Sequence, residues 1–323
     1  MLEEVRKVEA YIIVNNVDDS ILKLNNIIEG YEFVKYTFQE LEDQYSSLFY
    51  HKIDNASDKL KFDNNNIVSN SFFNKIHSSK FFNHHNIHSA SAIFFRPKKI
   101  FQSSAENGLS LVDVSDYLET TRKVFNDLII KLRLYKQGDI NYLASFAIIE
   151  ATREVIILSQ KHMSNVHQHL YKILDNDVEI LKEQIPENIV ENDFTELAIN
   201  NFQLSYEIAN PEIRYINLIT ALESLFNLDS SIPIAHIVSR HTSLILSKSK
   251  DEFNKMYKDI KTMYALRSKI VHGGNKNVQE VNMNLVELQN IVRSVIWYCL
   301  KVNMNKKELF DFLNSKGYSS LHN

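Results

Sequence analysis

The sequence predicts a mainly α-helical protein in which a mixed α/β N-terminal domain precedes a C-terminal helical bundle. After Pro186, apolar residues recur almost without interruption at steps of three and four, the spacing of amphipathic helices. Short β-branched runs of strand type occur before that point. The chain has 323 residues, of which 44% are hydrophobic, enough for two domains and at least one sizeable core. We therefore expect an N-terminal domain at residues 1–186 and a bundle at residues 187–323.

The N-terminal elements follow from local patterns. Residues 11–14 (Tyr-Ile-Ile-Val) and 92–95 (Ala-Ile-Phe-Phe) are expected to be strands, the second ending before Pro97. The polar stretch 55–86 between them is typical of irregular structure. From Asp116 the spacing predicts an amphipathic helix that ends near Gly138. Residues 139–160 fit either two paired strands or one helix, and their periodicity does not decide between them.

The C-terminal part is expected to contain six helices, and two prolines help to place them. Pro211 and Pro233 lie at or beside predicted helix starts, where the missing amide hydrogen costs nothing. Six helices within about 125 residues predict a bundle. The expected helices are residues 188–209, 212–227, 233–247, 250–272, 277–302 and 306–314.

Composition narrows the classes of protein. No apolar run is long enough to span a membrane and the N-terminus lacks the pattern of a secretory signal, so we expect a cytoplasmic protein without a membrane partner. The lone Cys299 excludes an internal disulfide and a multi-cysteine zinc site, and its apolar surroundings indicate core packing. Net charge is −4, but from Leu197 onward 15 basic residues face 11 acidic ones. The C-terminal part is thus the more suitable half for an anionic partner.

The predicted helix 250–272 carries an arginine on its apolar side. Its apolar positions continue at the same spacing onto Arg267, where a hydrophobic residue is expected. A charge on that side requires an acidic partner, a cleft or an interface, because burying it alone would cost several kcal/mol. Glu223, which lies between Leu222 and Leu225 in the apolar helix 212–227, is the candidate partner. The apolar positions before Arg267 are Phe253, Met256, Tyr257, Ile260, Met263 and Tyr264.

His272 follows Arg267 by five residues and precedes Gly273 and Gly274, a helix-stop signal. Arginine stays charged and histidine titrates near neutral pH, so the two residues can cleave a phosphodiester without a metal. On a straight helix, however, five residues rotate the two side chains about 140° apart and separate them by about 7.5 Å. Pairing of the helix with its own copy across a two-fold axis would let two such pairs converge on one cleft.

Together these residues resemble the HEPN superfamily, and most closely the ApeA-like HEPN domains of prokaryotic anti-phage defence. The resemblance covers about residues 187–303 and rests on the segment from Tyr264 to Gly273, with its Arg-x4-His spacing, and on the segment Ala221–Phe226 together with Arg214. Residues 132–138 also resemble the segment that precedes the bundle in such proteins. Ser268 departs from many active members, which carry Asn, Asp or His after the arginine.

The resemblance implies a metal-independent endoribonuclease that needs no cofactor and acts as a homodimer with a composite site. His272 would act as general acid or base, and Arg267 would stabilise the charge on the phosphorane, giving 2′,3′-cyclic phosphate and 5′-hydroxyl ends. Ser268 and Glu223 would support them, and Lys269 and Arg214 would bind substrate. The implied setting is phage defence or a toxin, with RNA, tRNA among the candidates, as substrate. The N-terminal domain would sense a phage-derived trigger or regulatory protein, or select substrate.

Other interpretations stay open at this stage. Arg267 and Glu223 can form a structural ion pair with His272 as a capping residue, and the bundle can be a non-catalytic module for dimerisation and for binding RNA or a protein. The histidines at positions 77, 84, 85 and 88, and those at 162, 167 and 169, are interpreted as exposed loop residues rather than metal ligands. The chain has six glycines and no phosphate-binding glycine loop, so nucleotide-driven chemistry is not expected.

Overall fold

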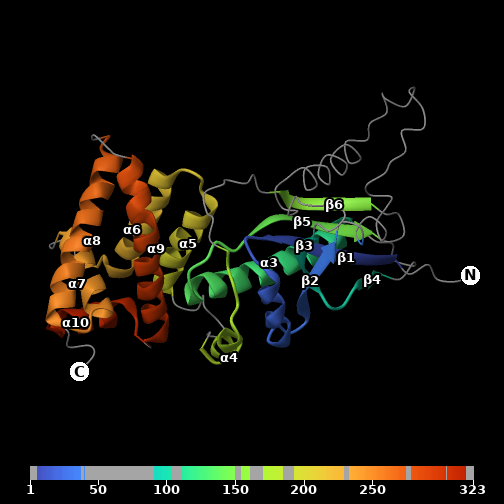
Figure 1. The fold of residues 1–323 in the computed structure, drawn as a ribbon, viewed down its shortest axis with the longest axis horizontal. Helices are drawn as coiled ribbons and strands as arrows, with labels where there is room; N and C mark the ends of the chain where they lie inside the picture. The colour runs from blue at the N-terminus through green and yellow to red at the C-terminus, as the bar shows by residue number, and fades with distance from the viewer. Residues whose placement is uncertain are drawn as a thin grey trace, which may run out of the picture. The chain divides into compact units, whose positions relative to one another are not determined.

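The computed structural model describes residues 6–37, 40, 91–103, 111–149, 154–160, 170–184, 193–228, 233–273, 278–302 and 304–317. In this part of the chain helices predominate and the strands lie in the N-terminal half (Figure 1), so the mainly α class is confirmed. The chain divides into two compact units, one built around the sheet and one of helices. The described parts of the helical unit include Ile130–Gln137, ahead of the expected boundary at residue 186, as well as the helices after it.

An antiparallel sheet organises the N-terminal unit. Strand β1 (Arg6–Asn15) lies at its centre, with β5 (Asn141–Ile149) on one side and β3 (Ser91–Pro97) and β4 (Phe101–Ser103) on the other. The strand order is β2-β3-β1-β5-β6, where β2 is Tyr31–Thr37 and β6 is Glu154–Gln160. Segment 139–160 therefore forms two paired strands. The stretch 55–86 lies outside the described residues.

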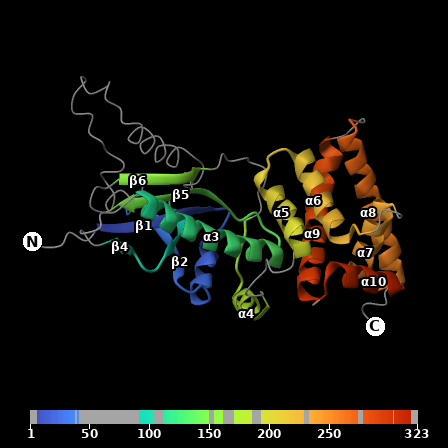
Figure 2. The ribbon, with the colours of Figure 1, turned by 180° about the vertical axis from the view of Figure 1, so that it is seen from behind.

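Helix α3 (Leu111–Tyr135) covers one face of the sheet, which Figure 2 shows from the helix side. Val114 and Leu118 pack on alternate residues of β1, Val8 and Ala10, because successive strand side chains point to opposite faces. Phe125 continues the contact through the ring of Phe95, 5.0 Å away. The unit also contains the short helices η1 (Asp19–Asn26) and α4 (Asp175–Gln184).

The helical unit contains α5 (Asp193–Glu207), α6 (Pro211–Phe226), α7 (Ile234–Leu246), α8 (Lys250–Val271), α9 (Val278–Lys301) and α10 (Lys306–Ser315). These agree closely with the six predicted helices. Local signals explain the agreement: Asn210 caps α6 ahead of Pro211, Ser249 caps α8, and Asn305 forms a capping box with Glu308.

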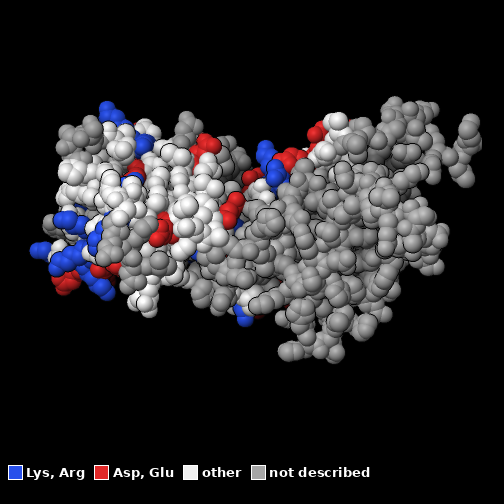
Figure 3. Space-filling model, turned by 90° about the horizontal axis from the view of Figure 1, so that it is seen from above, with Lys and Arg blue, Asp and Glu red and all other residues white. Residues whose placement is uncertain are grey.

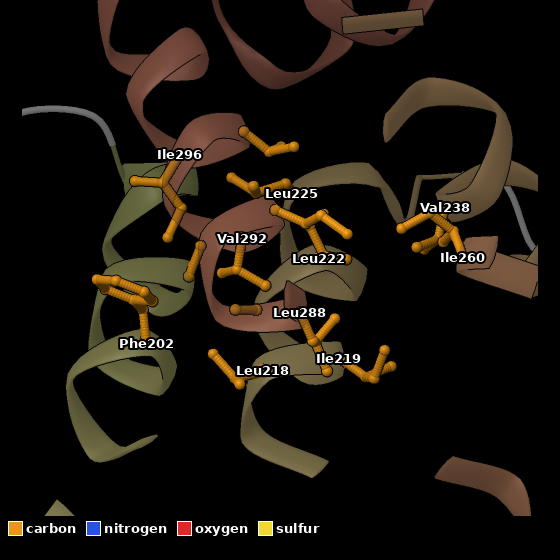
Figure 4. Close-up of a cluster of buried hydrophobic side chains, with 14 of the residues drawn as sticks. Phe202, Leu218, Ile219, Leu222, Leu225, Val238, Ile260, Leu288, Val292 and Ile296 are labelled. Carbon is orange, nitrogen blue, oxygen red and sulfur yellow. The ribbon is translucent and has the colours of Figure 1, made fainter. Parts of the chain in front are cut away.

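Helix α6 runs through the middle of the helical core. Its Leu218, Ile219 and Leu222 meet residues from α5, α8 and α9 in a cluster of fully buried side chains (Figure 4). Each such side chain stabilises the fold by about 1.5–3 kcal/mol. Cys299 is also buried there and has no solvent exposure, which confirms its predicted place in the core.

Candidate functional site

Arg267 occupies the side of α8 that packs on the rest of the bundle. The buried residues Met263, Leu266 and Ile270 surround it in sequence, and only 25% of its side chain is exposed. Its position on this side follows from the three-and-four spacing that α8 keeps over its length. The guanidinium is therefore held against the bundle, with one part of it open to solvent.

Glu223 of α6 meets this guanidinium, as the sequence predicts. The carboxylate Oε2 lies 3.6 Å from Nη2 of Arg267, and 18% of the Glu223 side chain is exposed. The other carboxylate oxygen, Oε1, accepts a hydrogen bond of 2.6 Å from the phenol of Tyr264. One carboxylate thus joins two residues that lie three apart on α8.

Tyr264 is a site residue that the sequence did not single out. Burial raises the pKa of its phenol to about 12, and the bond to the negative Glu223 acts in the same direction. The phenol therefore remains protonated near neutral pH and can go on donating to Glu223. Arg267 lies with its Cζ 5.9 Å from the centre of the Tyr264 ring. The spacing 264–267 was visible as part of the apolar stripe, but nothing in the sequence distinguishes a packing tyrosine from one bonded to Glu223.

The guanidinium of Arg267 is not saturated by these contacts. Its Nε is buried and has no hydrogen-bond partner among the described residues. The Nη2–Oε2 separation of 3.6 Å is an ion pair beyond ideal hydrogen-bond length. Because the Nε is closed to solvent, a further acceptor such as a phosphate oxygen would meet the exposed part of the Arg267 side chain.

His272 forms the end of α8. It is the C-cap residue, with φ −91° and ψ 10°, and its backbone N–H donates to the Ser268 carbonyl at 3.0 Å. Gly273 follows with φ +68°, a conformation that favours glycine and that ends the helix. The His272 side chain is exposed.

The fold of the single chain brings Arg267 to Glu223 but does not bring His272 to either of them. Within the described residues, no hydrogen bond or ion pair links His272 to Arg267 or Glu223. The helical geometry separates the two by about 140°, with Val271 and Ser268 on the arc between them. Val271 is 47% exposed and Ser268 is half-buried, so the surface that joins the two residues is open to solvent at the last turn of α8.

Two predicted substrate-binding residues have different surroundings. Lys269 is exposed on α8, as a phosphate contact requires. Arg214 is only 1% exposed, and its Nε donates to the Ser205 carbonyl at 2.6 Å. The side chain therefore ties α6 to α5 inside the bundle, and a substrate contact by Arg214 stays a prediction that this buried position does not favour.

The described residues also bear on metals and membranes. They contain no group of three or more His, Cys, Asp or Glu side chains placed to hold a metal ion. The two predicted loop groups of histidines lie outside the described residues. Among the helices that are described, none is long and apolar enough to cross a membrane.

Comparison with known proteins gives no relative for this chain: no family model, no curated protein and no solved structure matches it.

Proposed function

We propose that the helical unit is a metal-independent endoribonuclease of HEPN type that works as a homodimer in anti-phage defence or as a toxin. The observation that supports this most directly is the last turn of α8, where a half-buried arginine paired with Glu223 and an exposed histidine flank an open surface. A charge-stabilising group and a proton-transfer group are the minimum that RNA cyclisation requires.

In the proposed reaction the ribose 2′-oxygen attacks phosphorus while the bond from phosphorus to the 5′-oxygen breaks. The His272 imidazole of one protomer accepts the proton of the 2′-hydroxyl and then, as the imidazolium, gives it to the leaving 5′-oxygen, so that 2′,3′-cyclic phosphate and 5′-hydroxyl ends result. Arg267 would stabilise the negative charge that accumulates on the phosphorane.

Homodimerisation would supply the missing proximity of arginine and histidine. Exposed apolar residues occur where α8 ends and α9 begins: Val271 (47% exposed), Met283 (75%) and Val286 (40%). Large exposed apolar side chains near a site are suited to an interface. Contact between two copies through this end of the bundle would place the last turns of both α8 helices close together.

A non-catalytic module for dimerisation and for RNA or partner binding is the second candidate. The Glu223–Arg267 pair favours this second candidate. The carboxylate of Glu223 already offsets the positive charge of Arg267, which would otherwise stabilise a phosphorane. In this alternative the bundle binds without cleaving, and Arg267 stabilises the bundle alone.

Cleavage in the presence of a chelator separates the two candidates. The purified protein is expected to cut RNA in excess EDTA and to leave cyclic phosphate ends, and His272→Ala is expected to abolish cutting. Because His272 is exposed, the variant should keep the mass and thermal stability of the wild type. Cutting that requires magnesium, or that survives His272→Ala, would rule out the ribonuclease proposal.

A further inference from the structure

The outward face of α8 carries a row of lysines that leads to His272. Lys258, Lys261 and Lys269 are all exposed, and together with Ala265 and His272 they follow one another at steps of three and four residues. This spacing places all five side chains within a sector of about 80° on the helix, over a length of about 21 Å. We call these three lysines the lysine stripe.

The stripe differs from an ordinary solvated helix face. Such faces commonly alternate charge, with acidic residues three or four positions from each lysine. None of the three lysines has an acidic residue at those distances, and Lys258 and Lys261 are themselves a like-charge pair that disfavours the helix. Among the described residues, no ion pair engages any of the three.

The positive charge is also local. The whole chain has a net charge of −4, so the stripe does not result from a generally basic composition. On α8 the acidic residues are Asp251, Glu252 and Asp259, and only Asp251 shares the sector of the stripe, about 10 Å before Lys258. Figure 3 shows Lys and Arg side chains gathered at the end of the bundle that carries α7, α8 and α10, with a few Asp and Glu side chains among them and a largely uncharged surface beside them.

An uncompensated row of this kind suits a polyanion with regularly spaced charges. Two copies of the chain would not meet along it, because the lysines of one copy would face those of the other. Nucleic-acid backbone fits, since each lysine that meets a phosphate releases condensed counterions. A single strand fits better than a duplex, because attack by a 2′-oxygen requires it in line with the leaving oxygen, and an A-form duplex holds it out of line.

We propose that Lys258, Lys261 and Lys269 form the track along which the backbone of a single-stranded RNA reaches His272. The proposal rests on the function proposed above and adds the substrate's form and path. Ala265 leaves the middle of the track free of a bulky side chain.

The test measures RNA binding separately from cutting. In a His272→Ala background, anisotropy of a fluorescent single-stranded RNA is titrated in EDTA at several salt concentrations. A plot of log affinity against log salt has a negative slope, to which each contact with a single strand contributes about −0.7. The triple variant Lys258→Gln, Lys261→Gln and Lys269→Gln should therefore make this slope shallower by about 2. On the same basis, affinity near 0.1 M salt should fall about fivefold for each contact.

The matched control removes the same charge elsewhere on the bundle. Lys250, Lys301 and Lys307 are exposed and lie outside the stripe, at the start of α8, the end of α9 and the start of α10. Changing these three to Gln should leave the slope within about 0.5 of its starting value, because counterion release depends on contacts and not on net charge alone. Circular dichroism spectra of both triple variants check that the helices are retained.

The outcomes separate this proposal from the ribonuclease. If wild-type protein does not cut RNA but binding depends on the stripe and not on the control lysines, the track stands and the ribonuclease falls. If the protein cuts RNA, and the three lysine substitutions change neither binding in the His272→Ala background nor cutting when His272 is present, the track alone is overturned. Equal losses in the two triple variants, absence of binding, or tighter binding of the matching duplex would also overturn it.

Discussion

At the scale of single residues, Tyr264 determines which carboxylate oxygen of Glu223 is left for Arg267. The phenol takes Oε1 and leaves Oε2 to Arg267, so the carboxylate is fixed on the α8 side of α6. A hydrogen bond to a charged acceptor contributes about 1.5–3 kcal/mol to stability, more than a neutral one. The pair of Glu223 and Arg267 is partly exposed and contributes less.

Tyr264→Phe is expected to lower the free energy of unfolding by about 1–2 kcal/mol, because it leaves Oε1 without its donor while keeping the ring. Chemical denaturation measures the change. Tyr257→Phe is the matched control: Tyr257 lies seven residues earlier on α8 and bonds the exposed His236 at 2.8 Å. In a double-mutant cycle, Glu223→Gln and Tyr264→Phe should couple by about 1 kcal/mol, and additive effects would contradict the assigned bond.

The buried His241 is expected to make the stability of the helical unit depend on pH. It is 1% exposed between the rings of Phe226 and Phe310, and burial lowers the pKa of its imidazole to about 4. Electrostatic interaction with Arg240 and His236 acts in the same direction, whereas the bond to Asn314 opposes the change. The folded protein therefore holds His241 neutral at a pH where an unfolded chain would bind a proton.

The contribution of His241 to the free energy of unfolding is expected to be fully present above pH 6.5, the ordinary pKa of histidine. It should decline as the pH falls from 6.5 towards about 4, the pKa in the folded protein. The loss attributable to this one residue is about 3 kcal/mol at pH 4. Denaturant unfolding at a series of pH values measures it against His241→Gln, which does not titrate. Equal pH dependence in the two proteins would show that His241 is not the responsible group.

At the scale of elements, the helices after Pro186 were predictable from their periodicity, and Pro211 marked the start of one of them. In the structure Asn210, Ser249 and Asn305 cap three of these helices. Strand β2 was missed because its sequence, Tyr31–Thr37, has a single fully buried side chain, Phe33. Pairing with β3 makes it a strand, and such pairing is a tertiary contact that local sequence does not carry.

The candidate site was likewise predictable only in part from the sequence. The sequence identified Arg267 and Glu223 as a pair because each is a charge on an apolar helix. It could not show that Tyr264 shares the carboxylate, nor that Arg214 is directed into the bundle. Both depend on the way α6 crosses its neighbours, and α6 is apolar on nearly every side, so its pattern does not reveal which face meets which helix.

The end of α8 depends on Gly273, whose φ of +68° is strained for any residue with a Cβ. Gly273→Ala is expected to destabilise the helical unit by about 1 kcal/mol, although an added Cβ would meet no atom within 4 Å. Thermal unfolding measures this, with Gly317→Ala as control, since Gly317 has equal space but no positive φ. A loss of similar size at both positions would indicate an effect of glycine replacement in general rather than of the αL turn after His272.

At the scale of the whole molecule, the geometry of α8 makes a specific demand on any catalytic assembly. Arg267 and His272 are separated by about 140° around the helix, and among the described residues no hydrogen bond or ion pair joins them. If one phosphate needs both groups, a dimer can supply the arginine from one copy and the histidine from the other. A site completed in this way differs in a measurable respect from one completed within a single copy.

Mixing two inactive variants tests this arrangement. Arg267→Ala and His272→Ala homodimers should each fail to cut RNA, but a mixed dimer retains one Arg267 and one His272 on different copies. After co-unfolding and refolding of an equal mixture, random association makes about half of the dimers mixed, and RNA cutting should return to a fraction of the wild-type rate. A site within one copy predicts no recovery, because neither copy then has both residues. Native mass spectrometry of differently tagged variants verifies that mixed dimers are present, and their presence without cutting would refute assembly across the two-fold axis.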